Sequence, residues 1–118
     1  MKFLCVVYAD GKKFDAMSDA ERQTLDADSL AYDDELRRGG HFIVADALQP
    51  VRTAKTVRKR DGKVSVVDGP FAETKEQLGG FILINARNFD EAVQLASNVP
   101  MARVGSIEVR PIMELSRQ

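Results

Sequence analysis

The chain has 118 residues, of which 44% are apolar and 30% charged, and 17 Lys and Arg against 18 Asp and Glu give a net charge of −1. We therefore expect a single soluble domain over residues 1–118, located in the cytoplasm. The basic residues are spread along the chain, which argues against direct nucleic-acid binding, and the apolar runs are too short for a membrane span or a signal peptide.

The first predicted element is a strand over residues 2–8, KFLCVVY, which is rich in β-forming residues and ends at the turn signal Asp10-Gly11. Its cysteine, Cys5, lies within an apolar run and is expected to be a small buried hydrophobe. Because Cys5 is the one cysteine and His41 the one histidine, the sequence excludes an internal disulfide and a zinc site of the Cys/His kind.

A long helix is predicted from about residue 18 to residue 38. Ser18 and Glu21 have the spacing of a capping box, which marks its start. Gly39-Gly40 offers the left-handed conformation that ends helices. Its inner stripe is formed by Leu25, Ser29, Tyr32 and Leu36.

A second strand is predicted over residues 41–48 and begins with His41, which we expect to be a surface or capping residue. Residues 53–59 and 63–67 then flank Asp61-Gly62, the commonest signal for a two-residue hairpin turn. A turn of that length sets Lys55 opposite Asp68 across the hairpin.

The remaining predicted elements are a buried strand over residues 80–86, a helix begun by Asn88 and Glu91 and closed by Pro100, and a final strand over residues 106–113. This order predicts an α+β fold of the ferredoxin-like βαββαβ type with an inserted β-hairpin. In that fold an antiparallel sheet carries two helices on one face.

The two longest apolar runs, FLCVVY and FILI, are apolar at consecutive positions, so both faces of these strands need burial. Two helices on one face leave the other face uncovered. A second copy of the same sheet is the simplest cover, so we expect a homodimer with the sheets packed face to face.

Residues 66–80, VVDGPFAETKEQLGG, combine a predicted bend at Asp68-Gly69-Pro70 with several carboxylates and a glycine pair. One interpretation is structural, with Phe71 anchoring the loop on the core and the charges solvated. In a second, Asp68 and Glu73 line a cleft between hairpin and sheet as general acid and base. In a third, these carboxylates hold a hard cation.

Three further features bear on this cleft. Tyr8, at the end of the first strand, and Arg58, on the hairpin, could both reach it, and Arg58 would suit an anionic ligand. Gly79-Gly80 lacks the pattern of a phosphate-binding loop and is expected to be a bulge or a close backbone approach.

The segment DGPFAETKEQLGG, preceded by TVRKRDGKVSVV and followed by SIEVRPI, resembles the DGPF-domain branch of the YCII-related family over essentially the whole chain. The resemblance implies a ferredoxin-like domain of the dimeric α+β barrel type. For some members it implies a sigma-factor-linked transcription context. The positions matching the branch's own motif are Arg58, Asp68, Gly69, Pro70, Phe71, Glu73, Lys75, Glu76, Gly79 and Gly80.

Some relatives in the wider family are enzymes that use a His–Asp pair on small organic substrates. That pair cannot be carried over, because the corresponding part of the first helix reads DADSLAY, with Asp28 or Ser29 near the place of the histidine. His41 lies beyond the end of this helix and does not replace it.

Three functional hypotheses follow. The first is a homodimer in an accessory or regulatory role that binds a small organic ligand. Its pocket is formed by Tyr8, Arg58, Asp68, Phe71, Glu73 and Lys75. The second is an enzyme acting on a small organic acid or lactone, with Asp68 or Glu73 as general base. The third makes the loop a purely structural part of the dimer. We expect no cofactor and no metal.

Overall fold

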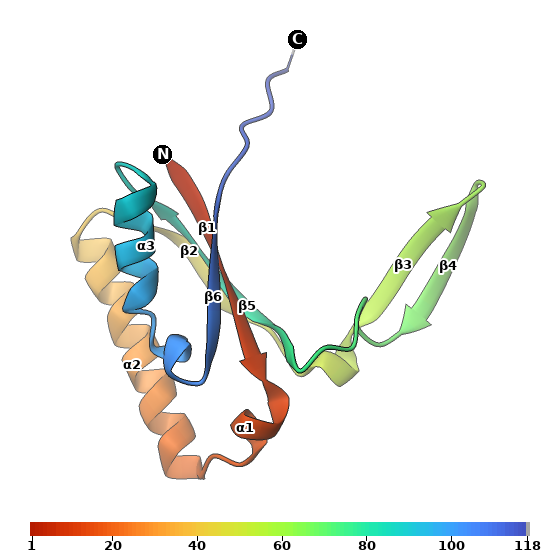
Figure 1. The fold of residues 1–118 in the computed structure, drawn as a ribbon, viewed down its shortest axis with the longest axis horizontal. Coiled ribbons are helices and arrows are strands. Elements are labelled where there is room, and N and C mark those ends of the chain that lie inside the picture. The colour runs from red at the N-terminus through yellow and green to blue at the C-terminus, as the bar shows by residue number, and fades with distance from the viewer. Residues whose placement is uncertain (118) are drawn as a thin grey trace.

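A four-stranded antiparallel sheet forms the centre of the computed structural model, which describes residues 1–117 (Figure 1). The strands are β1 (Lys2–Asp10), β2 (Phe42–Ala47), β5 (Glu76–Asn85) and β6 (Gly105–Pro111), in the spatial order β2-β5-β1-β6. Helices α2 (Asp19–Arg38) and α3 (Phe89–Ser97) lie on one side of this sheet (Figure 1). The predicted α+β class and the antiparallel sheet are confirmed.

Three short helical segments were not predicted. They are the helix α1 (Gly11–Asp15) and the 3-10 turns η1 (Val51–Thr53) and η2 (Pro100–Arg103). Strand β5 also begins four residues before the predicted boundary, and β6 ends two residues before it. None of the helices within residues 1–117 is both long and apolar enough to cross a bilayer.

Helix α2 begins and ends as its sequence predicts. The Ser18 hydroxyl accepts a hydrogen bond from the Glu21 backbone N–H at 3.1 Å, and the Glu21 carboxylate accepts one from the Ser18 N–H at 3.0 Å. This reciprocal pair satisfies two donors that a helix start leaves unpaired. Gly40 follows the helix with a φ of +76°, the left-handed conformation that glycine adopts without steric cost.

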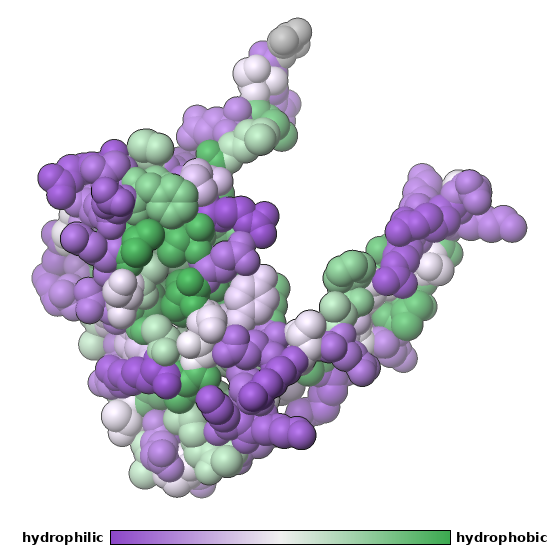
Figure 2. All heavy atoms as spheres, in the orientation of Figure 1, coloured by the Kyte–Doolittle hydropathy of each residue, from purple (hydrophilic) through white to green (hydrophobic). Residues whose placement is uncertain are grey.

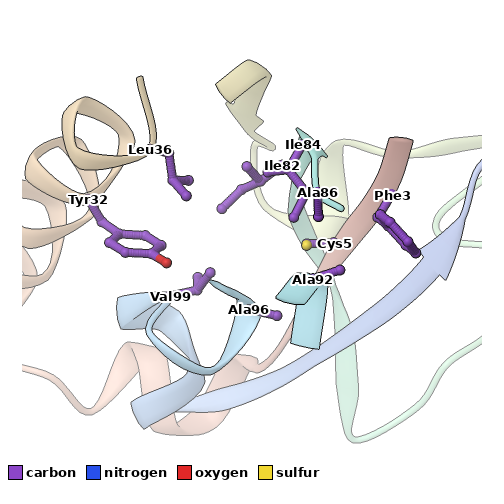
Figure 3. Packing of buried hydrophobic residues seen from close by; sticks show 10 residues of the cluster. All are labelled: Phe3, Cys5, Tyr32, Leu36, Ile82, Ile84, Ala86, Ala92, Ala96 and Val99. Atoms are coloured by element: carbon purple, nitrogen blue, oxygen red, sulfur yellow. The ribbon is translucent and has the colours of Figure 1, made fainter. Parts of the chain in front are cut away.

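The hydrophobic core lies between the sheet and the two long helices (Figure 3). It is formed by Phe3, Cys5, Tyr32, Leu36, Ile82, Ile84, Ala86, Ala92, Ala96 and Val99. Cys5 is 1% exposed within this core, so the prediction of a small buried hydrophobe is confirmed, and burial raises the pKa of its thiol to about 11. The Tyr32 hydroxyl donates to the Leu95 carbonyl oxygen at 2.6 Å and so ties α2 to α3.

The opposite face of the sheet is apolar at its centre, and neither α2 nor α3 covers it. Leu4 lies opposite Leu83 and Val6 opposite Phe81, and each alternates along its strand with a core residue. Val44 extends the same surface on β2 with 39% of its area exposed. We call this surface the open face.

Strands β3 (Lys55–Arg60) and β4 (Lys63–Asp68) form a separate two-stranded sheet, which we call the arm. Its register is the predicted one, with Lys55 opposite Asp68. Asp61 and Gly62 have φ values of 51° and 76°, as a two-residue turn of this kind requires. The arm lies on the side of the sheet away from α2 and α3 and stands clear of the body of the molecule (Figures 1 and 2).

Candidate functional site

A cavity of about 570 Å³ lies at the end of the sheet where β1 finishes and β5 begins. Each of its lining residues carries a polar or charged group, while the aliphatic and aromatic parts of these side chains form most of its surface. The lining residues are Tyr8, Asp10, Lys13, Thr74, Lys75, Glu76 and Ser106. They come from three strands, the short helix α1 and the segment that leads from the arm into β5.

The strand register places four of these side chains on the open face. Tyr8 lies opposite Ser106 of β6, and Asp10 lies opposite Glu76 of β5. Residues at alternate positions of a strand share a face, so Tyr8 and Asp10 continue the surface that begins with Val6. The cavity is therefore the polar end of a surface whose centre is apolar.

Two glycines set the local geometry of the sheet at this end. The register between β1 and β5 shifts at Val7/Tyr8, where Gly79 is the additional residue of a β-bulge. A side chain at Gly80 would come within 2.9 Å of the Asp46 carbonyl oxygen. The prediction of a bulge or a close backbone approach at Gly79-Gly80 is confirmed in both of its forms.

Two carboxylate residues of the cavity lie at paired positions of β1 and β5. Asp10 is only 6% exposed, and its Oδ1 accepts a hydrogen bond from the Lys12 backbone N–H at 2.9 Å, which caps α1. The Glu76 carboxylate accepts a hydrogen bond from the Ser106 hydroxyl at 2.9 Å. Like charges directly opposite each other on neighbouring strands are destabilising. Cationic groups or hydrogen-bond donors of a ligand could pair with both carboxylates here.

The segment before β5 is held in place by the side chain of Gln77. Its amide nitrogen donates to the carbonyl oxygens of Ala72 and Thr74, both at 3.0 Å. This fixes the backbone on the side of the cavity formed by Thr74 and Lys75. The cavity is thus lined by three strands, by the short helix α1 and by a loop that the Gln77 side chain holds in place.

Residues 1–116 match the model of the YCII-related domain. The chain belongs to the YCII-related family. An uncharacterised protein of Rhizobium meliloti (strain 1021) is 37% identical over 114 residues, which cover 95% of this chain and 92% of that protein.

Among solved structures, this YCII-related chain resembles 5-chloro-2-hydroxyhydroquinone dehydrochlorinase from Burkholderia phenoliruptrix AC1100, in complex with 2,5-dihydroxybenzoquinone. The TM-score is 0.56 at 18% sequence identity, and the match covers 96% of this chain and 94% of that one. The likeness shows a shared fold.

The structure distributes the six predicted site residues of the YCII-related chain over two places. Tyr8 and Lys75 line the cavity. The other four are Arg58, Asp68, Phe71 and Glu73, and they lie on the arm or in the loop that follows it. The six residues are not brought together within one chain, and their binding roles remain predictions.

The predicted anchoring of Phe71 on the core is wrong, because 77% of this side chain is exposed. The Arg58 guanidinium instead lies 5.6 Å from the centre of the Phe71 ring, a cation–π contact within the arm and its loop. Asp68 forms an ion pair with Lys55 at 2.7 Å, and its side chain is 86% exposed. These exposed groups do not form the predicted cleft between hairpin and sheet.

Sequence reasoning missed five cavity residues. They are Asp10, Lys13, Thr74, Glu76 and Ser106. Asp10 was interpreted only as part of a turn, although an acid at the end of an otherwise apolar strand was a usable signal. Glu76 was noted only as a motif position and Ser106 only as the start of a predicted strand, and the spacing of these four residues along the chain gives no sign of a shared site.

Other residues considered from the sequence have structural partners away from the cavity. His41 contacts the Asn85 carbonyl oxygen through Nδ1 at 2.8 Å and joins the start of β2 to the end of β5. Asp28 forms an ion pair with Arg103 at 2.7 Å, and Ser29 is half-buried on α2. A smaller cavity of about 340 Å³ lies beside the first turns of α2, where its one carboxylate, Glu21, is engaged in the capping box.

Proposed function

We propose that this YCII-related chain is a homodimeric small-molecule-binding protein whose ligand occupies the cavity at the end of the sheet. The facing carboxylates of Asp10 and Glu76, set beside Tyr8 on the open face, support this assignment. Carboxylates at paired positions of neighbouring strands are an unfavourable pairing, and a ligand that donates hydrogen bonds to both would offset it. The binding serves an accessory or regulatory role, including a sigma-factor-linked context.

The lining indicates the chemical class of the ligand. Two carboxylates accept hydrogen bonds, Lys13 and Lys75 donate them, and the hydroxyl of Tyr8 does either. A volume of about 570 Å³ is within the range of small-molecule sites. A single ring carrying hydroxyl groups and anionic or carbonyl oxygens fits these requirements. The dihydroxybenzoquinone held by the dehydrochlorinase belongs to this class.

The finer fold and the dimer are part of the same proposal. The strand order β2-β5-β1-β6, with antiparallel neighbours, supports a ferredoxin-like βαββαβ arrangement with the arm as its insertion. The apolar open face supports a dimer of the α+β barrel type, in which the sheets of two copies cover each other. The sequence of residues 68–80 supports membership of the DGPF branch.

The facing carboxylates also favour a second candidate, an enzyme. Two carboxylates that reach one substrate can serve as general acid and general base. In this candidate Asp10 takes the role that the sequence assigned to Asp68 or Glu73, because Asp10 is buried at the cavity. The substrate is a small hydroxylated ring, organic acid or lactone.

Calorimetric titration with 2-hydroxyhydroquinone under anaerobic conditions tests the binding site. Glu76→Gln is compared with Glu73→Gln, a matched change three residues earlier, at an exposed position outside the cavity lining. Loss of a hydrogen bond to a charged acceptor is expected to weaken binding at least about tenfold in Glu76→Gln. Glu73→Gln is expected to bind like wild type.

Two results would contradict the assignment. One is an equal loss of affinity in both variants. The other comes from an NMR titration with the same probe, if the amide chemical shifts change only for residues outside the cavity. The enzyme candidate adds one requirement. Product must form from a hydroxylated-ring substrate, and Asp10→Asn must abolish turnover while Asp68→Asn retains it.

A further inference from the structure

One surface of the arm is an apolar patch with no partner within the described residues. Val57 pairs with Val66 across the two strands, and Val64 lies next along the same face, opposite Lys59. The pair Lys55–Asp68 bounds the other end of this face. The side chains of Val57, Val66 and Val64 are 65%, 57% and 64% exposed, respectively. We call this surface the valine face. An isolated two-stranded hairpin is marginally stable in water, so a free arm with this face in solvent is unfavourable.

The base of the arm is closed by further contacts between its two sides. The Gly69 backbone N–H donates to the Ala54 carbonyl oxygen at 2.8 Å, and the Thr56 hydroxyl donates to the Gly69 carbonyl oxygen at 2.9 Å. The contact between Arg58 and Phe71 adds a third brace. These contacts lie within the arm and the short segments on either side of it, and the arm stands clear of the body of the molecule (Figure 2), so the valine face is exposed.

The arm and the open face lie on the same side of the molecule. Figure 1 shows α2 and α3 on one side of the sheet and the arm on the other, and Figure 2 shows the arm separated from the body. A second copy packed on the open face therefore lies beside the arm. The valine face is in this sense continuous with the interface of the proposed dimer.

Charge favours a copy of this chain as the partner. The arm, Lys55–Asp68, carries five cations and two carboxylates, whereas the whole chain has a net charge of −1. The rest of the chain is therefore net acidic. An arm of opposite charge to the body of a second copy is attracted to it during association.

The areas also agree with this arrangement. Four strands of about seven residues give the open face about 450 Å² on each copy, less than the roughly 800 Å² per partner of a standard stable interface. The two strands of the arm give a face of about 200 Å². When each copy buries its open face and its own arm and also receives the arm of its partner, the area buried per copy approaches this standard size.

We propose that the arm is an intermolecular clasp, whose valine face is buried on the second copy of the dimer. This rests on the face-to-face dimer of the proposed function and adds the surface that completes it. Each copy contributes its own arm, because a two-fold dimer uses every contact twice. The arm folds stably only with its valine face covered.

The decisive comparison is between two neighbouring residues of β4. Val66→Lys places a charge in the proposed contact, and Val67→Lys places the same charge on the opposite face of the arm, where Val67 is 52% exposed. By sedimentation equilibrium, Val66→Lys is expected to weaken the dimer at least about tenfold, and Val67→Lys by less than about threefold. Val44→Lys serves as the corresponding change on the open face.

Hydrogen exchange gives a second measurement. Amides of β3 and β4 are expected to be protected in wild type at high protein concentration and to lose protection on dilution or in Val66→Lys. Protection that is independent of concentration would overturn the clasp, because the arm would then be stable alone.

The remaining outcomes separate the two proposals. If Val44→Lys dissociates the dimer and Val66→Lys does not, the clasp is wrong and the sheet dimer stands. Equal effects of Val66→Lys and Val67→Lys would also overturn the valine face as the contact. A wild-type chain that is monomeric at micromolar concentration overturns both the dimer and the clasp. Ligand binding in the cavity is tested separately by the calorimetric titration.

Discussion

Replacing Gly105 by alanine tests how the sheet positions the cavity. Gly105 lies opposite Ala9, where β6 begins beside β1. A methyl group at Gly105 would collide with the carbonyl oxygen of Tyr8 and would lie 3.0 Å from its carbonyl carbon and 3.1 Å from the Ala9 Cα. All of these are backbone atoms of a central strand, so no side-chain rotation can relieve the collision, and the start of β6 must move away from β1.

The expected loss of stability is about 2 to 4 kcal/mol, from overpacking and from weakened strand hydrogen bonds at this end of the sheet. Urea unfolding followed by circular dichroism, at fixed protein concentration, should show a midpoint lower by roughly 1 to 2 M. Because Ser106 lies opposite Tyr8, the displacement also opens the cavity. Binding of 2-hydroxyhydroquinone should therefore weaken in the fraction that remains folded.

Gly79→Ala is the matched control, since Gly79 also lies in a strand near the cavity. A methyl group there would meet its nearest atom, the Val7 carbonyl oxygen, at 3.9 Å, an ordinary contact. Stability should change by less than about 1 kcal/mol, with alanine favoured by its lower chain entropy in the unfolded state. Similar losses in both variants would refute the reasoning, because the effect would then come from glycine replacement in general.

Three further predictions concern single side chains. Tyr32→Phe should cost about 1 kcal/mol at neutral pH, because the hydrogen bond to Leu95 is lost. Burial raises the folded-state pKa of Tyr32 from 10.0 to about 12. In urea unfolding, the difference in unfolding free energy between wild type and Tyr32→Phe should therefore be full below pH 10 and should shrink between pH 10 and pH 12. Cys5, whose pKa is raised to about 11, should resist iodoacetamide at pH 8 in the native protein and react once unfolded. Gln77→Ala should weaken probe binding, measured by calorimetry, with a stability loss below about 1 kcal/mol, because its two hydrogen bonds are exposed and brace the cavity loop.

Features specified by local spacing could be predicted from the sequence. The register of the arm followed from Asp61-Gly62, because a two-residue turn fixes every pair behind it. The start of α2 followed from Ser18 and Glu21 in the same way. In both cases the deciding interactions join residues a few positions apart, so distant parts of the chain had little influence.

Features created by distant pairing could not be predicted. Glu76 and Gln77 are polar and precede two glycines, so residues 76–79 have the composition of a loop. They are strand because β1 is long enough to pair with them as far as Asp10, which is 66 positions earlier. The five-residue helix α1 was missed for a related reason, since Asp10-Gly11 has the signature of a turn as well as of a helix start.

The cavity illustrates the same limit. Its carboxylates meet only because β1 and β5 are neighbours in the sheet, and Ser106 joins them only because β6 lies on the other side of β1. A search for carboxylates close in sequence therefore favoured Asp68 and Glu73. In the structure both side chains are exposed, and Asp68 is already paired with Lys55.

Residues 68–80 have a different role from the compact active site that their charges indicated. The segment starts at the end of the arm, passes the Phe71 contact that braces it, supplies Thr74, Lys75 and Glu76 to the cavity, and ends in the glycine bulge of β5. Its residues therefore connect two surfaces of the YCII-related chain, the arm and the ligand cavity, over fewer than ten positions. Phe71 contacts Arg58 of the arm, and the Gln77 side chain of β5 holds Ala72 and Thr74, so both ends of the loop are bonded to the elements that it joins. This connection gives the distinctive sequence at this place a structural role, and in the proposed function the ligand contacts fall to Asp10 and Glu76.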